Sequence, residues 1–403
     1  MADARIVAIG TAVPPVVVPQ RAARDILLAQ PGLGRVAQRL IGAAMDGSAI
    51  DARRTVIAEF AGLDGAGRAE AALAGTRAAD AASAPPPVFF DAATRRMLRP
   101  TTGQRNAEYV RQSVPLALDA ARAALASAPV PASAITHVIT VSCTGFFAPG
   151  LDVALVRGLG LRPDAQRLSI GFMGCHGAFP ALRAAVDACR ADPAAVVLVV
   201  CVELCTLHLR SSEDPDQIVS GTVFGDGAAA AVVAAHPRAG LRIDALHSQL
   251  AGSQSAGDLT WAIGDQGFDL VLSSYVPKLL EHEIGAALAP LDPGRSWSEI
   301  ENWAIHPGGR AILDRTQEAL GLADEQLAPS RAVLREYGNM SSPTVLFVLE
   351  RILRTARAGE RVVATAFGPG VTVESALMTV EGPDRERPGA LRPEAERAGS
   401  GTP

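Results

Sequence analysis

Apolar strands and amphipathic helices alternate along the chain from about residue 108, and this alternation limits the fold more than any other feature. VRQSVPLALDAARAALASA, residues 110–128, has the spacing of an amphipathic helix, and ITHVITVSCTG, residues 135–145, has the β-branched run of a buried strand. Further strands are expected in AAVVLVVCVELC and VFGDGAAAAVVAA, and a helix in LDVALVRGLGL. This alternation predicts an α/β fold with a largely buried central sheet.

The second half of the chain shows the same alternation of apolar strands and amphipathic helices, but less strongly. A strand and a turn are expected in NWAIHPGG, helices in AILDRTQEALGL and SSPTVLFVLERILRTA, and a pair of strands in RVVATAFGPGVTVESALMTVE. We therefore expect two similar halves, residues 1–237 and 238–381, with an Ala- and Gly-rich insert at about 60–90. The charged, Pro- and Gly-rich tail, residues 382–403, predicts disorder.

Composition argues against several classes of protein. The 403 residues carry a formal net charge of −5, which offers no basic field for a nucleic-acid backbone. The chain has no uncharged apolar run of about 18 residues and no signal-peptide pattern at its N-terminus, so we expect a cytoplasmic protein without a membrane span. The odd number of cysteines, five, argues against a disulfide framework, and their spacing misses the paired pattern of zinc sites, so no metal is expected.

Cys175 has a setting that a structural cysteine does not need. In GFMGCHGAFP it lies between Gly174 and Gly177, at the start of an alanine-rich helix. Glycines permit a tight turn that exposes a residue, and a helix N-terminus lowers a thiol pKa through its unpaired N–H groups. The pattern fits a nucleophile, but a tight packing turn between a strand and a helix would give the same pattern.

Two further residues lie beside glycine turns. His306 ends the apolar strand in NWAIHPGGR, where α/β folds present site residues, and is the candidate base. Asn339, in REYGNMSSPTVLFVL, precedes a helix, so its amide could donate to an oxyanion or could be an ordinary N-cap. His176 points away from a nucleophile at position 175 and is expected to pack or cap, whereas the role of His208 stays open.

The type III polyketide synthases, the chalcone-synthase-like branch of the thiolase superfamily, are the family that this chain resembles. The resemblance rests on five strings in matching order and at similar separations: GFMGCHGAFPALRAA, VFGDGAAA, IHPGGRAILD, YGNMSSPTVLFVL and AFGPGVTVE. It covers about residues 90–381, and the string VSCTGFFAPG is typical of bacterial members. The resemblance implies a homodimer with a thiolase-like fold, a layered αβαβα arrangement of two pseudo-duplicated halves.

The resemblance also implies roles for single residues. Cys175 would accept the acyl group, His306 would be its imidazolium partner, and Asn339 would donate with His306 to the thioester oxygen. Phe224, in VFGDG, matches a gatekeeping phenylalanine that helps to expel the malonyl carboxylate as carbon dioxide. The implied enzyme condenses an acyl-CoA starter with malonyl-CoA and cyclises the chain to a pyrone or phenolic product, with coenzyme A thioesters as substrates and no cofactor.

A further set of positions is implied to line the cavity. These are Cys143, Thr144, His208, Trp261, Leu270, Ser341, Phe367, Gly368, Pro369 and Gly370. Trp261 falls where the family has a cavity-floor glycine, and Leu270 falls where it has a second gatekeeping phenylalanine. A re-routed cavity, such as a tunnel for an aliphatic starter, would follow from these two departures. The alanine-rich insert is thin in basic residues, and only Arg77 is nominated there for coenzyme A docking.

Two other functions stay open. A ketoacyl-carrier-protein synthase III-like condensing enzyme also has a Cys-His-Asn triad but would take its extender from an acyl carrier protein. A catalytically silent acyl-CoA-binding or scaffold homologue is opposed by the intact Cys175, His306 and Asn339. The starter, the number of malonyl extensions and the mode of ring closure are left undetermined by the sequence.

Overall fold

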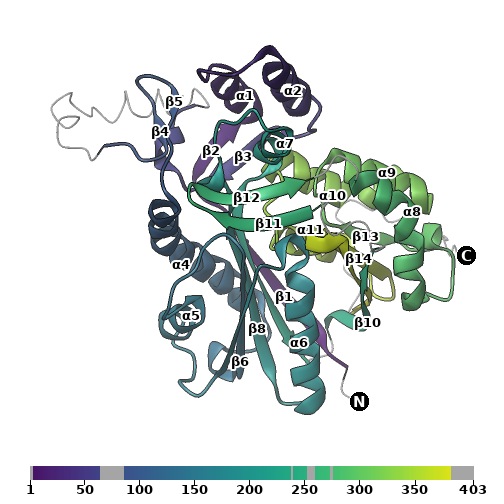
Figure 1. Cartoon of the computed structure of the whole chain (residues 1–403). Helices are drawn as coiled ribbons and strands as arrows, with labels where there is room; N and C mark the ends of the chain where they lie inside the picture. Colours follow the sequence, from purple (N-terminus) through teal and green to yellow (C-terminus); the bar gives the residue numbers. More distant parts are fainter. Residues whose placement is uncertain (1–2, 64–85, 237–238, 252–258, 273–275, 383–403) are drawn as a thin grey trace, which may run out of the picture.

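The computed structural model describes residues 3–63, 86–236, 239–251, 259–272 and 276–382. Nine strands form the largest sheet, and across it they lie in the order β13 (Asn302–Ile305), β14 (Arg361–Gly368), β15 (Thr372–Glu381), β10 (Gly240–Leu250), β1 (Arg5–Ala12), β9 (Asp226–Ala234), β8 (Val196–Leu204), β6 (His137–Ser142) and β7 (Gln166–Gly171). The strands expected from the apolar runs are therefore present, and Figure 1 shows them running through the centre of the molecule.

The strand order contains an internal repeat. From β1 outward the first half runs β1, β9, β8, β6, and from β10 outward the second half runs β10, β15, β14, β13. In both runs the first two pairings are antiparallel and the third is parallel. The two runs meet where β1 pairs with β10 at Arg5↔Arg242 and Ile6↔Leu241. The expectation of two similar halves is confirmed in this pairing pattern, whereas the boundary at residue 237 stays a prediction.

Two helices fill the space between the half-sheets. α6 (Ala178–Ala191) and α11 (Thr344–Thr355) belong to one apolar core, together with residues of β8 and β9 from the first half and of β14 and β15 from the second. Alternate residues of β8 face the opposite way, into a second core, because successive side chains of a strand point to opposite faces. All nine residues of β8 are buried, as a strand between two layers requires.

Other helices cover the outer faces of the sheet. α4 (Thr102–Ser127) packs on β1, β8 and β9, and α8 (Val276–Leu288) contacts β10, β15 and α9 (Arg310–Leu320). In Figure 1, α4 and α5 (Leu151–Gly158) lie on one side of β6 and β8, and α6 lies on the other. Outer helices, half-sheet, inner helices, half-sheet and outer helices make five layers, so the layered αβαβα arrangement is confirmed.

A group of shorter elements gathers at one end of the sheet, and the sequence patterns did not predict them. They are β2 (Val16–Pro19), α1 (Gln20–Leu28), α2 (Arg35–Asp46), β3 (Ala52–Thr55), α7 (Pro215–Val223), β11 (Leu259–Gly264) and β12 (Gly267–Leu272). α7 packs on α2 and β12, which joins the beginning and the middle of the chain over the end of the sheet (Figure 1).

Most of the expected helices begin close to their predicted residues, with one exception. α4 begins at Thr102, well before residue 110, because the Thr101 hydroxyl and the Gln104 side chain form a capping box at its start. Residues 64–85, within the Ala- and Gly-rich insert, and residues 383–403 lie outside the described residues, so the predicted disorder of the tail stays a prediction. None of the helices within the described ranges combines the length and apolar character needed to cross a membrane.

Candidate active site

The turn before α6 presents Cys175. Cys175 lies in a short 3-10 turn, Gly174–His176, that follows β7 and ends just before the helix. Gly174 has φ +64°, a left-handed conformation that favours glycine, and a Cβ there would lie 2.6 Å from Cδ of Pro369. Gly177 has an ordinary φ of −56° and is needed for packing instead, because a Cβ there would lie 2.8 Å from Val141. The two glycines thus serve the turn in different ways.

Asn339 lies next to Cys175, although 164 residues separate them in the chain. The Cys175 sulfur lies 3.8 Å from both Oδ1 and Nδ2 of Asn339. The backbone N–H of Ser341 donates to Oδ1 at 2.7 Å, and Nδ2 donates to the Gly308 carbonyl at 3.2 Å, which fixes the orientation of the amide. The N-cap alternative is wrong, because α11 begins at Thr344 with Pro343 as its N-cap.

His306 follows the last residue of β13 and continues that strand's contact with β14. Its backbone N–H donates to the Thr365 carbonyl at 2.8 Å, and the residue is only 1 % exposed. Among the described residues, neither ring nitrogen has a hydrogen-bond partner. A buried imidazole without partners is costly, so its nitrogens are suited to a ligand that enters the site.

The ionisation of the thiol and the imidazole is controlled by burial. Burial raises the pKa of the Cys175 thiol to about 11, and the side chains of Ser341 and Asn339 only partly oppose this. Burial lowers the pKa of the His306 imidazole to about 3, and the nearby His176 adds to the effect. The start of a helix therefore does not by itself lower the pKa of this thiol. A thiolate needs a counter-charge here, and transfer of its proton to His306 would supply one without changing the net charge of the site.

A cavity of about 490 Å³ joins the candidate residues. Its walls include Cys175, Phe224, Trp261, His306, Asn339, Phe367, Gly368 and Pro369. The Phe224 and Trp261 rings meet edge to face, with centroids 6.1 Å apart. The structure thus brings the three candidate catalytic residues and the candidate gatekeeper to one apolar space.

Cys143, Thr144 and Ser341 are absent from the lining of this cavity. The Gly174 N–H contacts the Cys143 sulfur at 3.1 Å, and the Thr144 hydroxyl donates to Glu203 at 2.9 Å. Ser341 is fully buried. Cys143 thus supports the turn that carries Cys175, Thr144 binds β8, and the Ser341 side chain lies against the Cys175 thiol. The absence of these residues from the cavity lining differs from the position that the resemblance implied.

His208 faces a neighbouring space, which it shares with Phe224 and Trp261. Its Nε2 lies 2.8 Å from the Thr144 carbonyl, and its Nδ1 accepts from the Phe268 N–H at 3.2 Å. Burial lowers the pKa of His208 to about 4. With both nitrogens occupied and the ring neutral, His208 holds the β11–β12 hairpin in place.

The other positions expected to line the cavity or to dock coenzyme A are Leu270, Gly370 and Arg77, and none of them is seen in the cavity lining that the described residues form. Leu270 pairs with Trp261 in the β11–β12 hairpin, and its side chain lies outside the described part of the structure. Gly370 has φ +70° and belongs to the loop after β14 but is absent from the cavity lining. Arg77 lies outside the described residues.

Sequence reasoning missed Glu203, which is fully buried on β8 below the Cys175 turn. It accepts hydrogen bonds from the Cys143 N–H, the Thr144 hydroxyl and, at 2.7 Å, the Ser342 hydroxyl. Burial raises the pKa of its carboxyl to about 7. The signal was present, since Glu203 is the one acidic residue in the run AAVVLVVCVELC.

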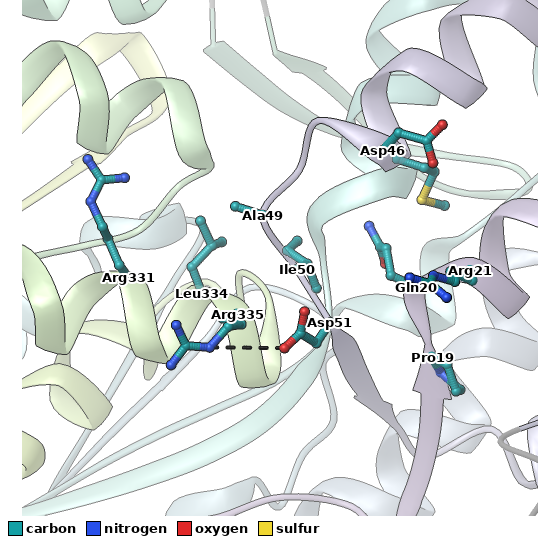
Figure 2. A pocket seen from close by; sticks show the side chains of 11 residues that line it. Pro19, Gln20, Arg21, Asp46, Ala49, Ile50, Asp51, Arg331, Leu334 and Arg335 are labelled. Atoms are coloured by element: carbon teal, nitrogen blue, oxygen red, sulfur yellow. Dashed lines mark ion pairs between the residues drawn. The ribbon is translucent and has the colours of Figure 1, made fainter.

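A second, more open groove lies beside this cavity and is shown in Figure 2. It measures about 740 Å³ and lies between Arg331 and Arg335 of α10 (Asp324–Tyr337) and the loop that precedes β3. The Arg335 guanidinium lies 4.0 Å from the Asp51 carboxylate across the groove. None of the candidate catalytic residues lines the groove, so it is distinct from the cavity that holds Cys175.

Within the described residues, no three side chains of His, Cys, Asp or Glu gather as metal ligands would.

Comparison with known proteins identifies the class to which this fold and site belong. The family description "Chalcone and stilbene synthases, N-terminal domain" matches residues 92–237, and "Chalcone and stilbene synthases, C-terminal domain" matches residues 245–381. The two matches cover well over half of the chain. The chain therefore belongs to the chalcone and stilbene synthase family, and it is a type III polyketide synthase, an acyltransferase.

Particular relatives agree with this assignment. The chain is 36% identical over 283 residues to "Alpha-pyrone synthesis polyketide synthase-like Pks18" of Mycobacterium tuberculosis, which covers 68% of this chain and 72% of that protein. Among solved structures, PKS-I from the brown alga Ectocarpus siliculosus has a TM-score of 0.82 and 30% identity, and the match covers 94% of this chain and 98% of that one. Tetrahydroxynaphthalene synthase of Streptomyces coelicolor has a TM-score of 0.77 and 25% identity, over 94% and 99% of the two chains.

Proposed function

We propose that this polyketide synthase loads an acyl group from an acyl-CoA starter onto Cys175 and extends it with malonyl-CoA. The observation that carries the proposal is the contact of the Cys175 sulfur, at 3.8 Å, with an oriented Asn339 amide, in a cavity that also contains the unpartnered His306 ring. Nucleophile, proton acceptor and oxyanion donor are the three groups that a thioester exchange requires.

The chemistry follows in two stages. The Cys175 proton passes to His306, the thiolate attacks the thioester carbonyl, and coenzyme A leaves with the proton as the acyl-enzyme forms. Malonyl-CoA then loses carbon dioxide, and the electron pair of the broken bond remains as an enolate whose oxygen accepts hydrogen bonds from His306 and Asn339. The enolate carbon attacks the Cys175 thioester, a carbon–carbon bond forms, and the thiolate leaves. The face of Phe224 disfavours the malonyl carboxylate and favours the neutral product.

An aliphatic starter and an α-pyrone product are the substrate and product that we propose. Trp261 and Phe224 make the wall of the cavity apolar, which suits a hydrocarbon chain. The name of the mycobacterial relative, at 36% identity, states α-pyrone synthesis. No cofactor takes part in these steps, and we place the enzyme in the cytoplasm.

Arg310 is the group that we propose for coenzyme A docking. Among the described residues it is the one arginine or lysine that lines the cavity, and its side chain is 56% exposed at the start of α9. Its Nε lies 3.3 Å from Asp314, a weak surface ion pair that a phosphate could replace. Arg310 thus takes the place that sequence reasoning sought in the alanine-rich insert.

We also propose that the enzyme is a homodimer, formed at the β7 edge. β7 is the outermost strand of its half-sheet, and five of its six residues are exposed. Leu168 on this strand is 46% exposed, and Met173, just after the strand, is also exposed, as is Phe146, whose ring stacks on Phe172. An open edge with apolar side chains invites pairing with a second copy.

Intact-protein mass spectrometry tests the proposal. Wild type and Cys175→Ala are mixed with malonyl-CoA and a panel of short to long acyl-CoAs, and the released products are identified. An acyl adduct on wild type alone, together with a released polyketide, is the expected result. Condensation only with malonyl-carrier protein would favour the carrier-protein-dependent enzyme, and no adduct or carbon dioxide from any thioester would favour the silent homologue.

A further inference from the structure

A buried arginine lies directly behind the gatekeeper and does not line the cavity. Arg53, on β3, is 4% exposed. Its Nη1 donates to the carbonyls of Gly221 at 2.8 Å and Phe224 at 2.9 Å, and its Nε donates to the Gln20 side chain at 3.0 Å. No carboxylate within the described residues lies within ion-pair distance of the guanidinium. The buried Asp226 carboxylate, which lies beyond ion-pair distance, offsets part of the cost of burying this charge, so the direct partners of the guanidinium are the two backbone carbonyls and Gln20.

Gln20 extends the contact to a third carbonyl of the same segment. Its Nε2 donates to the Thr222 carbonyl at 2.8 Å and to the Ser48 hydroxyl at 3.1 Å. Arg53 and Gln20 therefore satisfy three carbonyls at the C-terminal end of α7, which leads directly into Phe224. Carbonyls at a helix end lack intrahelical partners, and a cation there is favourable. We call these two side chains the Arg53–Gln20 clamp.

The clamp also underlies the backbone bridge between Phe224 and Asn339. The Asn339 N–H donates to the Val223 carbonyl at 2.8 Å, and the Gly225 N–H donates to the Asn339 carbonyl at 2.9 Å. The aliphatic stem of Arg53 packs against the glycines on both strands of this bridge. A Cβ on Gly338 would lie 3.0 Å from the Arg53 Cγ, and a Cβ on Gly225 would lie 3.5 Å from its Cβ.

We infer that Arg53 is a positioning residue for the decarboxylation of malonyl-CoA: it fixes Phe224 and Asn339 relative to each other from the side that faces away from the substrate. The inference rests on the proposed function and deepens it. Phe224 must contact the malonyl carboxylate while Asn339 donates a hydrogen bond to the enolate oxygen. Loss of the carboxylate and stabilisation of the enolate therefore both depend on the distance between Phe224 and Asn339, which the backbone bridge sets. Loading of Cys175 by a starter uses Asn339 as an oxyanion donor but does not need the gatekeeper, so it depends less on the spacing between the two residues.

The test compares decarboxylation with loading in matched variants. Arg53→Met keeps an apolar stem and removes the donors, Arg53→Lys keeps the charge with a single ammonium group, and Arg54→Met is the control on the neighbouring, more exposed position. Carbon dioxide release from malonyl-CoA gives kcat and KM, and mass spectrometry gives the endpoint acyl loading of Cys175. Circular dichroism and thermal melting monitor the fold.

The expected result is a separation of the two readouts. Arg53→Met lowers kcat for decarboxylation about 10- to 100-fold, the effect of a small misplacement in a catalytic site, while endpoint loading and the KM for malonyl-CoA stay within about threefold of wild type. Arg53→Lys recovers part of the loss, and Arg54→Met matches wild type. If Arg53→Met does not fold, Gln20→Met, which removes only the outer part of the clamp, shows a smaller fall in the same direction.

Three outcomes overturn the inference. A proportional fall in loading and decarboxylation would make Arg53 merely structural, and unchanged decarboxylation in both Arg53→Met and Gln20→Met would remove it from the mechanism. A wild-type enzyme that loads no starter and releases no carbon dioxide would overturn the proposed function itself, together with this inference.

Discussion

Replacing His306 by glutamine tests whether the imidazole is the counter-charge that makes Cys175 reactive. Without His306, burial holds the pKa of the thiol at about 11. At pH 8 only about one thiol in a thousand would then be ionised, against roughly a quarter for an ordinary cysteine. Because the thiolate is the nucleophile, we expect His306→Gln to react with iodoacetamide at least about 100-fold more slowly than an ordinary free thiol near neutral pH.

The assay follows alkylation of the peptide that contains Cys175 by mass spectrometry between pH 6 and pH 10. Wild type should react readily at neutral pH, because a thiolate–imidazolium pair titrates as a unit, whereas the rate for His306→Gln should rise only as the pH approaches the thiol pKa. Asn339→Ala is the control, since it removes a neighbour of the sulfur but leaves the imidazole in place. Equal neutral-pH rates for wild type and His306→Gln would refute the ion-pair reasoning.

Other predictions concern specificity, assembly and stability. Trp261→Gly should lengthen or shift the polyketides because it opens the cavity wall, and an unchanged product profile by mass spectrometry would remove Trp261 from that wall. Arg310→Glu should raise the KM for acyl-CoA about tenfold and leave kinetics with N-acetylcysteamine thioesters unchanged, since those lack phosphates; equal effects on both would exclude a docking role. Leu168→Glu should convert a dimer to a monomer in light scattering, and a persistent dimer would place the interface elsewhere. Gly174→Ala should lose about 1–2 kcal/mol of unfolding free energy in urea from its left-handed backbone alone, and a stability equal to wild type would contradict the strain.

Local sequence patterns predicted the layers of the fold well. Continuous apolar runs such as AAVVLVVCVELC are unambiguous when a strand is buried on both faces, and β8 has that environment. The start of α4 was predicted too late, because its first turns carry polar residues and only the Thr101–Gln104 capping box marks the beginning. The elements around α2, α7 and the β11–β12 hairpin were missed, since their residues pack mainly on partners far along the chain.

The site was predictable in its residues and much less so in its physics. Glycine-flanked turns marked Cys175, His306 and Asn339, but no pattern shows that the thiol is buried enough to raise its pKa. For the same reason the sequence could not show that Cys143 supports the turn, or that Arg53 lies behind Phe224. Desolvation depends on which distant segments pack around a group, and that information is in the tertiary structure.

The internal repeat explains why residues so distant in sequence meet at one point. α6 and α11 hold equivalent places in the two halves, each leading into the matching strands β8 and β14, and both pack in the central layer. Cys175 lies in the turn before α6, and Asn339 lies in the turn before α11. His306 in turn follows β13, the counterpart of β6, whose end carries Cys143. The two halves therefore supply structurally equivalent positions to one site, but the residues at these positions differ. The first half provides the nucleophile, and the second half provides the proton acceptor and the oxyanion donor.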